Sequence, residues 1–192
     1  MRKIIINSKK ISQFRVVGVV LIYGLLLSEY FSLLNSKMVA VQASELMSNS
    51  IYSYFMSFSF VFTLLSTLVV WLISSFIFHL FAILLGGEST FKDIQKYTGL
   101  CYIIPLIGFI IAIFIFDRIE FPKENLNEFL ATNKSIVLIN WIINISSTLC
   151  FILTIPIIKY LYQLNWLKAV GAVVIPIGSI YLLGQFFADY VL

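Results

Sequence analysis

Five long apolar stretches, separated by short polar segments, constrain this chain more than any other feature. They run over residues 16–34, 54–85, 100–116, 136–158 and 169–188. At a helical rise of about 1.5 Å per residue, the first reaches about 28 Å, close to the ~30 Å hydrocarbon thickness of a bilayer. Only 11% of the 192 residues are charged, against roughly 25% in soluble domains. The sequence predicts an all-α, polytopic transmembrane helix bundle of about five spans.

The Lys and Arg residues orient this bundle. Residues 1–15 form a basic tail, and residues 16–192 are expected to form a single transmembrane domain. The polar segments on the side of the tail carry nine Lys and Arg residues, and those on the other side carry four. Because cytoplasmic loops are enriched in Lys and Arg, we expect a cytoplasmic N-terminus and, after five spans, a C-terminus outside. In a bacterium the membrane would be the plasma membrane.

The segment "LLGGESTF", residues 84–91, joins the second and third spans. It lacks the spacing of a phosphate-binding loop, because its glycines are adjacent and no lysine follows them directly. Glycine commonly ends a helix in the left-handed conformation, which fits Gly86 or Gly87. Thr90 and Asp93 resemble a capping box that starts the next helix. The segment is therefore expected to turn the chain and not to hold a ligand.

A short amphipathic helix is predicted after this turn. Phe91, Ile94 and Thr98 recur at spacings of three and four residues, which places them on one helical face. Lys92 and Lys96 flank that face and can reach lipid phosphates. We expect this helix to lie at the cytoplasmic membrane interface, between spans 2 and 3.

Two ionisable residues inside the apolar stretches are candidates for function, because charges are costly in a bilayer. Glu29 lies near the outer end of the first span and His79 near the inner end of the second. In a core of about 30 Å they would be ~12–13 Å apart in depth, too far to pair. A packed, hydrogen-bonded imidazole and a snorkelling or protonated carboxylate are the structural interpretations.

Polar residues also form a stripe along two spans. In the second span and the fourth they share helical faces, and this polar seam consists of Ser59, Thr63, Ser66, Ser74, Asn140, Asn144 and Ser147. Hydroxyl-bearing and small side chains let membrane helices pack closely. Alternatively, the seam lines a solute path, with Pro105, Pro156 and Pro176 breaking helices beside it.

The remaining chemistry of the sequence is sparse. A metal site needs several convergent ligands, whereas the chain has one histidine, and Cys101 and Cys150 lie in apolar stretches without CxxC spacing. No hydrolase or protease motif is present. The scattered cations behind the net charge of +4 do not indicate nucleic-acid binding. We therefore expect a non-enzyme without cofactor or metal.

Two segments resemble a known family. "FHLFAILLGGESTFKDIQKYTGLCYIIPLIGFI" and "WLKAVGAVVIPIGSIYLLGQFF" are similar to the central and last-span signatures of the Ypt/Rab-interacting (Yip) domain family, and the similarity covers residues 54–192. The resemblance implies five spans with the N-terminus in the cytoplasm. Eukaryotic members act in vesicle traffic, bind Rab GTPases and carry a long cytoplasmic N-terminal region. This chain resembles instead the compact bacterial members, some of which work beside exporters. The positions that match the family are Gly86, Gly87, Phe91, Gly99 and Pro105.

The expected function is that of a non-catalytic membrane adaptor that docks partner proteins at its cytoplasmic face, in export or membrane trafficking. The residues expected to form the turn and the docking surface are Gly86, Gly87, Thr90, Phe91, Lys92, Asp93, Lys96, Gly99 and Pro105. The alternative is a small-solute transporter or channel, or an exporter subunit, that uses the polar seam. Membrane lipids and proteins are the expected partners, nucleic acid is not, and homo-oligomer formation is left open.

Overall fold

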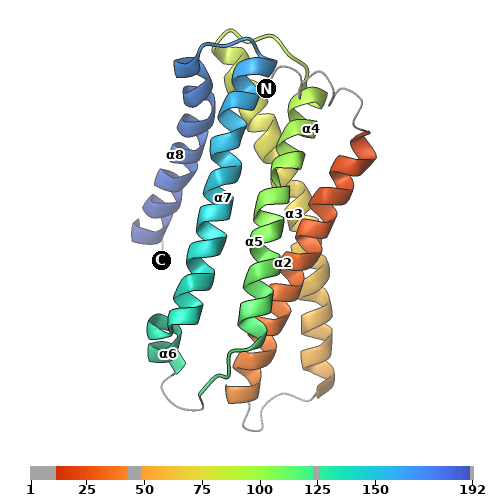
Figure 1. The fold of residues 1–192 in the computed structure, drawn as a ribbon, viewed down its shortest axis with the longest axis vertical. Coiled ribbons are helices and arrows are strands. Elements are labelled where there is room, and N and C mark those ends of the chain that lie inside the picture. Colours follow the sequence, from red (N-terminus) through yellow and green to blue (C-terminus); the bar gives the residue numbers. More distant parts are fainter. Residues whose placement is uncertain (1–11, 43–48, 123–125, 191–192) are drawn as a thin grey trace. The chain divides into compact units, whose positions relative to one another are not determined.

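The computed structural model describes residues 12–42, 49–122 and 126–190 (Figure 1). All secondary structure in these ranges is helical: α2 (Gln13–Gln42), α3 (Asn49–Leu84), α4 (Phe91–Cys101), α5 (Ile103–Asp117), α6 (Leu126–Thr132), α7 (Lys134–Leu161) and α8 (Trp166–Tyr190). The first eleven residues of the predicted basic tail lie outside the described ranges. The predicted all-α fold is confirmed.

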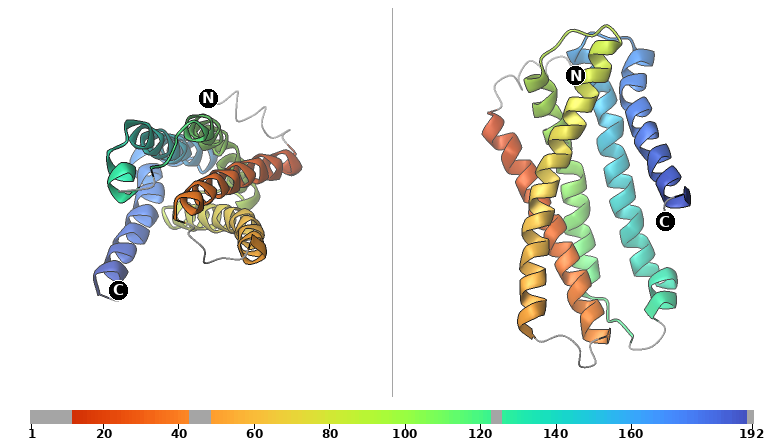
Figure 2. Two further views of the ribbon diagram at one scale, coloured as in Figure 1. Left: turned by 90° about the horizontal axis from the view of Figure 1, so that it is seen from below. Right: turned by 180° about the vertical axis from the view of Figure 1, so that it is seen from behind.

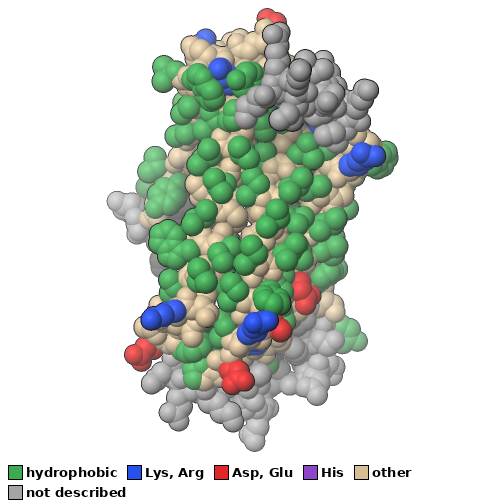
Figure 3. Space-filling view, in the orientation of Figure 1, with side chains coloured by type: hydrophobic (Ala, Val, Ile, Leu, Met, Phe, Trp, Pro, Cys, Tyr) green, Lys and Arg blue, Asp and Glu red, His purple; other side chains and the backbone are tan. Residues whose placement is uncertain are grey.

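Five helical segments are long and apolar enough to cross a bilayer. They are Gln13–Val39, Ser57–Leu84, Phe91–Asp117, Lys134–Leu161 and Trp166–Leu183. Figure 3 shows hydrophobic side chains over the visible faces of these helices, with charged side chains close to the helix ends. The number of spans agrees with the sequence prediction. The short helix predicted between spans 2 and 3 corresponds to α4, which the structure joins to α5 within the third candidate span, and its position at the membrane interface stays a prediction.

Only one residue separates α4 from α5. Tyr102 has φ −64° and ψ −12°, angles close to those of a helix, so α4 and α5 together make the third candidate span. Pro105 lies in the first turn of α5, where its missing N–H has no helical partner to lose.

The other two helix-internal prolines do not break their helices, contrary to the sequence expectation. α7 continues through Pro156 and α8 through Pro176. Proline removes one backbone hydrogen bond, but the remaining bonds of a long transmembrane helix and its neighbours hold the segment helical.

The described residues form two compact units. Of the described residues, the first comprises 12–16, 70–101 and 150–190, and the second comprises 17–42, 49–69, 102–122 and 126–149. Residues of α3 and of α7 belong to both units. The two units are described separately below.

In the first unit, the core lies where α3, α4, α7 and α8 meet. Its buried residues are Phe78, Ala82, Ile94, Ile158, Tyr162, Leu164, Ala169, Ala172 and Val173. Tyr162 is the largest fully buried side chain. This core holds the ends of α3 and α7 and the start of α8 in place.

In the second unit, α2, α3, α5 and α7 approach closely at small residues. A Cβ on Gly24 would lie 3.3 Å from Thr67 Cβ, and one on Gly108 would lie 2.5 Å from Ser146 Oγ. Lys37 Nζ donates to three carbonyl oxygens at the end of α5, at 2.7–3.1 Å. The small residues therefore serve close helix packing here.

Candidate functional site

The end of α3 is a helix cap built by two glycines. Gly86 has φ +88°, a left-handed conformation that glycine adopts without Cβ strain. The Gly86 N–H donates to Ile83 O at 2.8 Å, and the Gly87 N–H donates to Ala82 O at 2.9 Å. This pair of bonds is the Schellman motif. The predicted glycine cap is therefore present, with Gly86 as the left-handed residue.

Gly87 has a second role, which is close packing against the end of α7. A Cβ at this position would lie 2.7 Å from Tyr162 Cβ and 2.9 Å from Ala82 O. The next amide, that of Glu88, donates to Tyr162 O at 3.4 Å. Only a residue without a side chain fits here, and it brings two distant turns of the chain into contact.

The turn between α7 and α8 mirrors the glycine turn. Gln163 has φ +55°, and the Leu164 N–H donates to Lys159 O at 3.1 Å, which is the longer-range bond of a Schellman-type C-cap. Asn165 caps α8, because its Oδ1 accepts from the Lys168 N–H at 2.9 Å. Both turns are thus fixed by local hydrogen bonds.

A lysine fastens the two turns together. Lys168 Nζ donates to Leu85 O at 2.8 Å, which satisfies one of the carbonyls that a helix end leaves without a partner. We call residues 85–90 and 162–168, joined by this contact and by Gly87, the double turn.

The start of α4 is capped as the sequence predicted. The Asp93 N–H donates to Thr90 Oγ1 at 3.3 Å, and the Thr90 hydroxyl donates to Asp93 Oδ2 at 2.8 Å. The second bond differs from a capping box, in which the acidic side chain accepts from the backbone of the cap residue. Lys92 is exposed and Lys96 is half-buried, so both lysines reach solvent beside the cap.

The buried face of α4 follows the predicted amphipathic pattern. Ile94 and Thr98 are buried and Phe91 is half-buried. Gly99 allows close packing, because a Cβ there would clash with Val16 Cγ1 and lie 3.1 Å from Trp71 Nε1.

The side chain of Tyr162, the first residue of the second turn, forms a partly buried polar contact with His79. His79 Nδ1 and the Tyr162 hydroxyl are hydrogen-bonded at 2.5 Å. The Phe91 ring lies against His79, with centroids 5.7 Å apart. Burial, and then the negative charge of Asp93, raises the pKa of the Tyr162 phenol. The phenol therefore stays protonated at neutral pH and the contact is that of a hydrogen-bonded neutral tyrosine.

A second polar cluster in the first unit was not predicted. Ser75 Oγ and Thr98 Oγ1 are 2.7 Å apart, and Gln13 Nε2 donates to Gln95 Oε1 at 3.2 Å. The Trp71 Nε1–H is buried without a hydrogen-bond partner among the described residues. The sequence pattern places the adjacent residue, Ser74, in the polar seam. Which of the two serines pairs with Thr98 depends on the position of α4, which the sequence of α3 does not reveal.

The hydroxyl-bearing residues of the seam are half-buried. Thr63 Oγ1 donates to Ser59 O of its own helix at 2.8 Å. Ser66, Ser74 and Ser147 are half-buried. Each of these positions is compatible with helix packing.

The two asparagines of the seam lie on an exposed face of α7. Asn140 and Asn144 line a shallow depression of about 160 Å³ together with Val137 and Trp141. Neither amide has a hydrogen-bond partner in the part of the chain that the structure describes.

Glu29 is exposed on α2, and among the described residues no side chain bonds to its carboxylate. Within the same residues, no three His, Cys, Asp or Glu side chains come close enough to hold a metal ion. Cys101 is buried, Cys150 is half-buried, and both are free thiols.

Comparison with known proteins bears out the resemblance found in the sequence. Neither the curated proteins nor the solved structures contain a match to this chain. The family model of the Yip1 domain matches residues 8–187, a range that contains the double turn, α4 and all five candidate spans. The chain is therefore a multi-pass integral membrane protein and belongs to the Yip1 domain family.

Proposed function

We propose that this protein is a non-catalytic membrane adaptor that docks partner proteins on the double turn and the adjoining face of α4, and that this face is cytoplasmic. One observation carries the proposal. Two turns about 75 residues apart in sequence are fastened to each other by Gly87, Glu88 and Lys168, while their outward-facing groups stay exposed.

The exposed groups of this face are polar and of both charges. They are Glu88, Lys92, Gln163, Asn165 and Lys168. Their backbone is held by two Schellman-type C-caps and two N-caps. Binding to a backbone that is already ordered loses less conformational entropy, which favours recognition by another protein.

The charge distribution supports the orientation. The segments on the side of the N-terminal tail, which include the double turn, carry nine of the thirteen Lys and Arg residues. Under the positive-inside rule this side faces the cytoplasm.

The alternative function, a solute path along the polar seam, has less support. A path needs polar groups that face one another across a cavity or an interface. Asn140 and Asn144 instead lie on an exposed helix face, and Thr63 bonds within its own helix. We therefore favour the adaptor function over the solute path.

The test is capture of partner proteins from mild detergent extracts of native membranes, compared between the wild type and a Lys92→Glu/Lys96→Glu variant. Reversing two charges at a docking surface is expected to lower recovery about tenfold or more. Lys134→Glu, a charge reversal at the exposed start of α7, is the matched control and should capture like the wild type. Equal capture by all three proteins, or no partner with the wild type, would count against an adaptor.

A further inference from the structure

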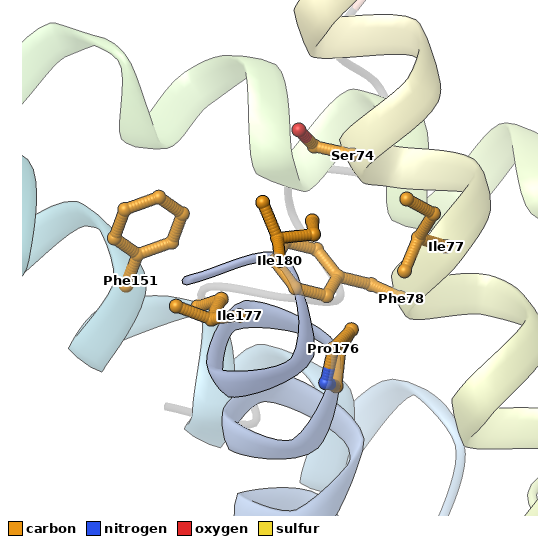
Figure 4. Close-up of a pocket in the computed structure, with 7 residues that line it drawn as sticks. All are labelled: Ser74, Ile77, Phe78, Phe151, Pro176, Ile177 and Ile180. Atoms are coloured by element: carbon orange, nitrogen blue, oxygen red, sulfur yellow. The ribbon is translucent and has the colours of Figure 1, made fainter. Parts of the chain in front are cut away.

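A crevice in the first unit lies between three helices. Seven side chains line it: Ser74, Ile77 and Phe78 from α3, Phe151 from α7, and Pro176, Ile177 and Ile180 from α8. Figure 4 shows these side chains around a common space. Its volume is about 150 Å³, equal to roughly five water molecules at about 30 Å³ each. A stretch of hydrocarbon chain fits such a space, and a whole lipid does not.

The crevice opens where α8 leaves the core. Ala169, Ala172 and Val173, in the first half of α8, are almost fully buried. By contrast, Ile180 is 59% exposed and Leu182 is 68% exposed. In Figure 2 the start of α8 lies beside the end of α7. The crevice is therefore bounded by packed helices of the first unit, and exposed apolar side chains of α8 lie at its edge.

The depth of the crevice matches the middle of an acyl chain. Phe78 and Ser74 lie six and ten residues before the end of α3 at Leu84, which is about 9 and 15 Å at helical rise. Ile180 lies twelve residues after Lys168, or about 18 Å. Half of a hydrocarbon core is about 15 Å, so with Leu84 and Lys168 at its edge the crevice would extend from the inner part of one leaflet to the bilayer midplane.

The helix ends above the crevice have the chemistry of the headgroup region. Lys159 Nζ lies 4.1 Å from the ring centroid of Trp166 and 5.0 Å from that of Tyr160, a combination typical of membrane interfaces. Lys168 Nζ uses one of its three donors on Leu85 O and keeps two for another acceptor. Lysines also outnumber acids at these ends, with Lys92, Lys96, Lys159 and Lys168 against Glu88 and Asp93.

We propose that the α3–α7–α8 crevice is a specific lipid site, which binds one acyl chain of an anionic phospholipid whose phosphate lies at Lys168. The lining is apolar except for the Ser74 hydroxyl, and apolar cavities of this size bind hydrocarbon in preference to water. The basic helix ends select the negative headgroup. The acyl-chain part of this site contains none of the residues of the double turn, and the two proposals share only Lys168.

The first experiment locates the acyl chain. The full chain is reconstituted in bilayer discs of phosphatidylglycerol and phosphatidylcholine, with a trace of phosphatidylglycerol that carries a photoreactive diazirine in mid-chain. Labelling is expected on the peptides that contain the lining residues. Ser74→Leu fills the crevice and should lower that labelling about tenfold. Ser179→Leu, the exposed neighbour of Ile180 that does not line the crevice, is the control and should label like the wild type.

The second experiment tests the headgroup. Phosphatidylcholine that carries the same diazirine chain should label the crevice about fivefold less than the phosphatidylglycerol probe. This factor corresponds to the attraction of one lysine for an anionic lipid surface. Lys168→Gln should remove this preference, and Lys134→Gln should keep it. Native helicity and a single gel-filtration peak show that each variant is folded. Labelling spread evenly over all spans, unchanged labelling in Ser74→Leu, or equal labelling by the two lipids would overturn the proposal.

Discussion

The double turn and the asparagine face of α7 are both polar regions of a membrane protein, but their polar groups are placed differently. In the double turn, Lys168 bonds to Leu85 O, and Tyr162 bonds to His79. On α7, Asn140 and Asn144 have no partner among the described residues. In an apolar environment, a polar group stabilises a fold only when it is paired. The first region is therefore expected to be sensitive to substitution and the second tolerant.

The largest effect is expected for Gly87→Val. The new side chain would overlap Tyr162 and the Ala82 carbonyl, and the backbone bonds of the Schellman motif prevent Gly87 from moving away. Overpacking of this kind costs about 3 kcal/mol, which should be visible as a lower midpoint of unfolding in detergent. Gly178→Val is the control, since no atom lies within 4 Å of a Cβ at Gly178, and its stability should change by about 0.5 kcal/mol or less. Equal losses in the two variants would contradict the close packing.

A smaller loss is expected for Tyr162→Phe. The ring still fills the core, but the half-buried His79 loses its hydrogen-bond partner, and the loss of one such hydrogen bond costs about 1 kcal/mol. Tyr160→Phe is the matched control, because Tyr160 is 40% exposed and its ring contact with Lys159 is kept by phenylalanine. The free energies of unfolding of the three proteins, measured in one detergent, give the comparison. A loss in Tyr160→Phe as large as that in Tyr162→Phe would refute the special role of the buried hydroxyl.

The same two variants should also differ in how their free energy of unfolding depends on pH in alkaline solution. Because the pKa of Tyr162 is raised in the folded protein, the unfolded phenol loses its proton first, near pH 10. Above that pH the unfolded state binds fewer protons, so the free energy of unfolding falls as pH rises, by at most about 1.4 kcal/mol per pH unit. Below pH 10 this contribution is constant. Tyr162→Phe should lose this component of the pH dependence and Tyr160→Phe should retain it.

The features that the sequence predicted are local in the chain. The glycine cap and the Thr90–Asp93 cap each join residues within about five positions, so their residue types and spacing suffice to recognise them. The face of α4 with Ile94 and Thr98 repeats with the helical period. The five spans follow from apolar length alone.

The features that the sequence did not predict are contacts between distant residues. Lys168 and Leu85 are 83 positions apart, as are His79 and Tyr162. The left-handed residue of the turn at Gln163 is not a glycine, so the residue types of this segment do not predict the turn. The side of α3 that faces α4 carries Ser75 and not Ser74. A difference of one position cannot be decided from polarity when serines are adjacent and the neighbouring helix is unknown.

The smallest effect is expected for Asn144→Leu. Because the amide has no partner among the described residues, its removal should change the free energy of unfolding by about 0.5 kcal/mol or less, and capture of partner proteins should be unchanged. Ser75→Ala is the comparison, since it removes one member of a buried hydroxyl pair at 2.7 Å and should cost about 1 kcal/mol. If Asn144→Leu were the more damaging of the two, the amide would have a partner in the membrane. Either a second copy of the chain or a solute path would then account for the exposed asparagines, and loss of a measured flux in Asn144→Leu would identify the path.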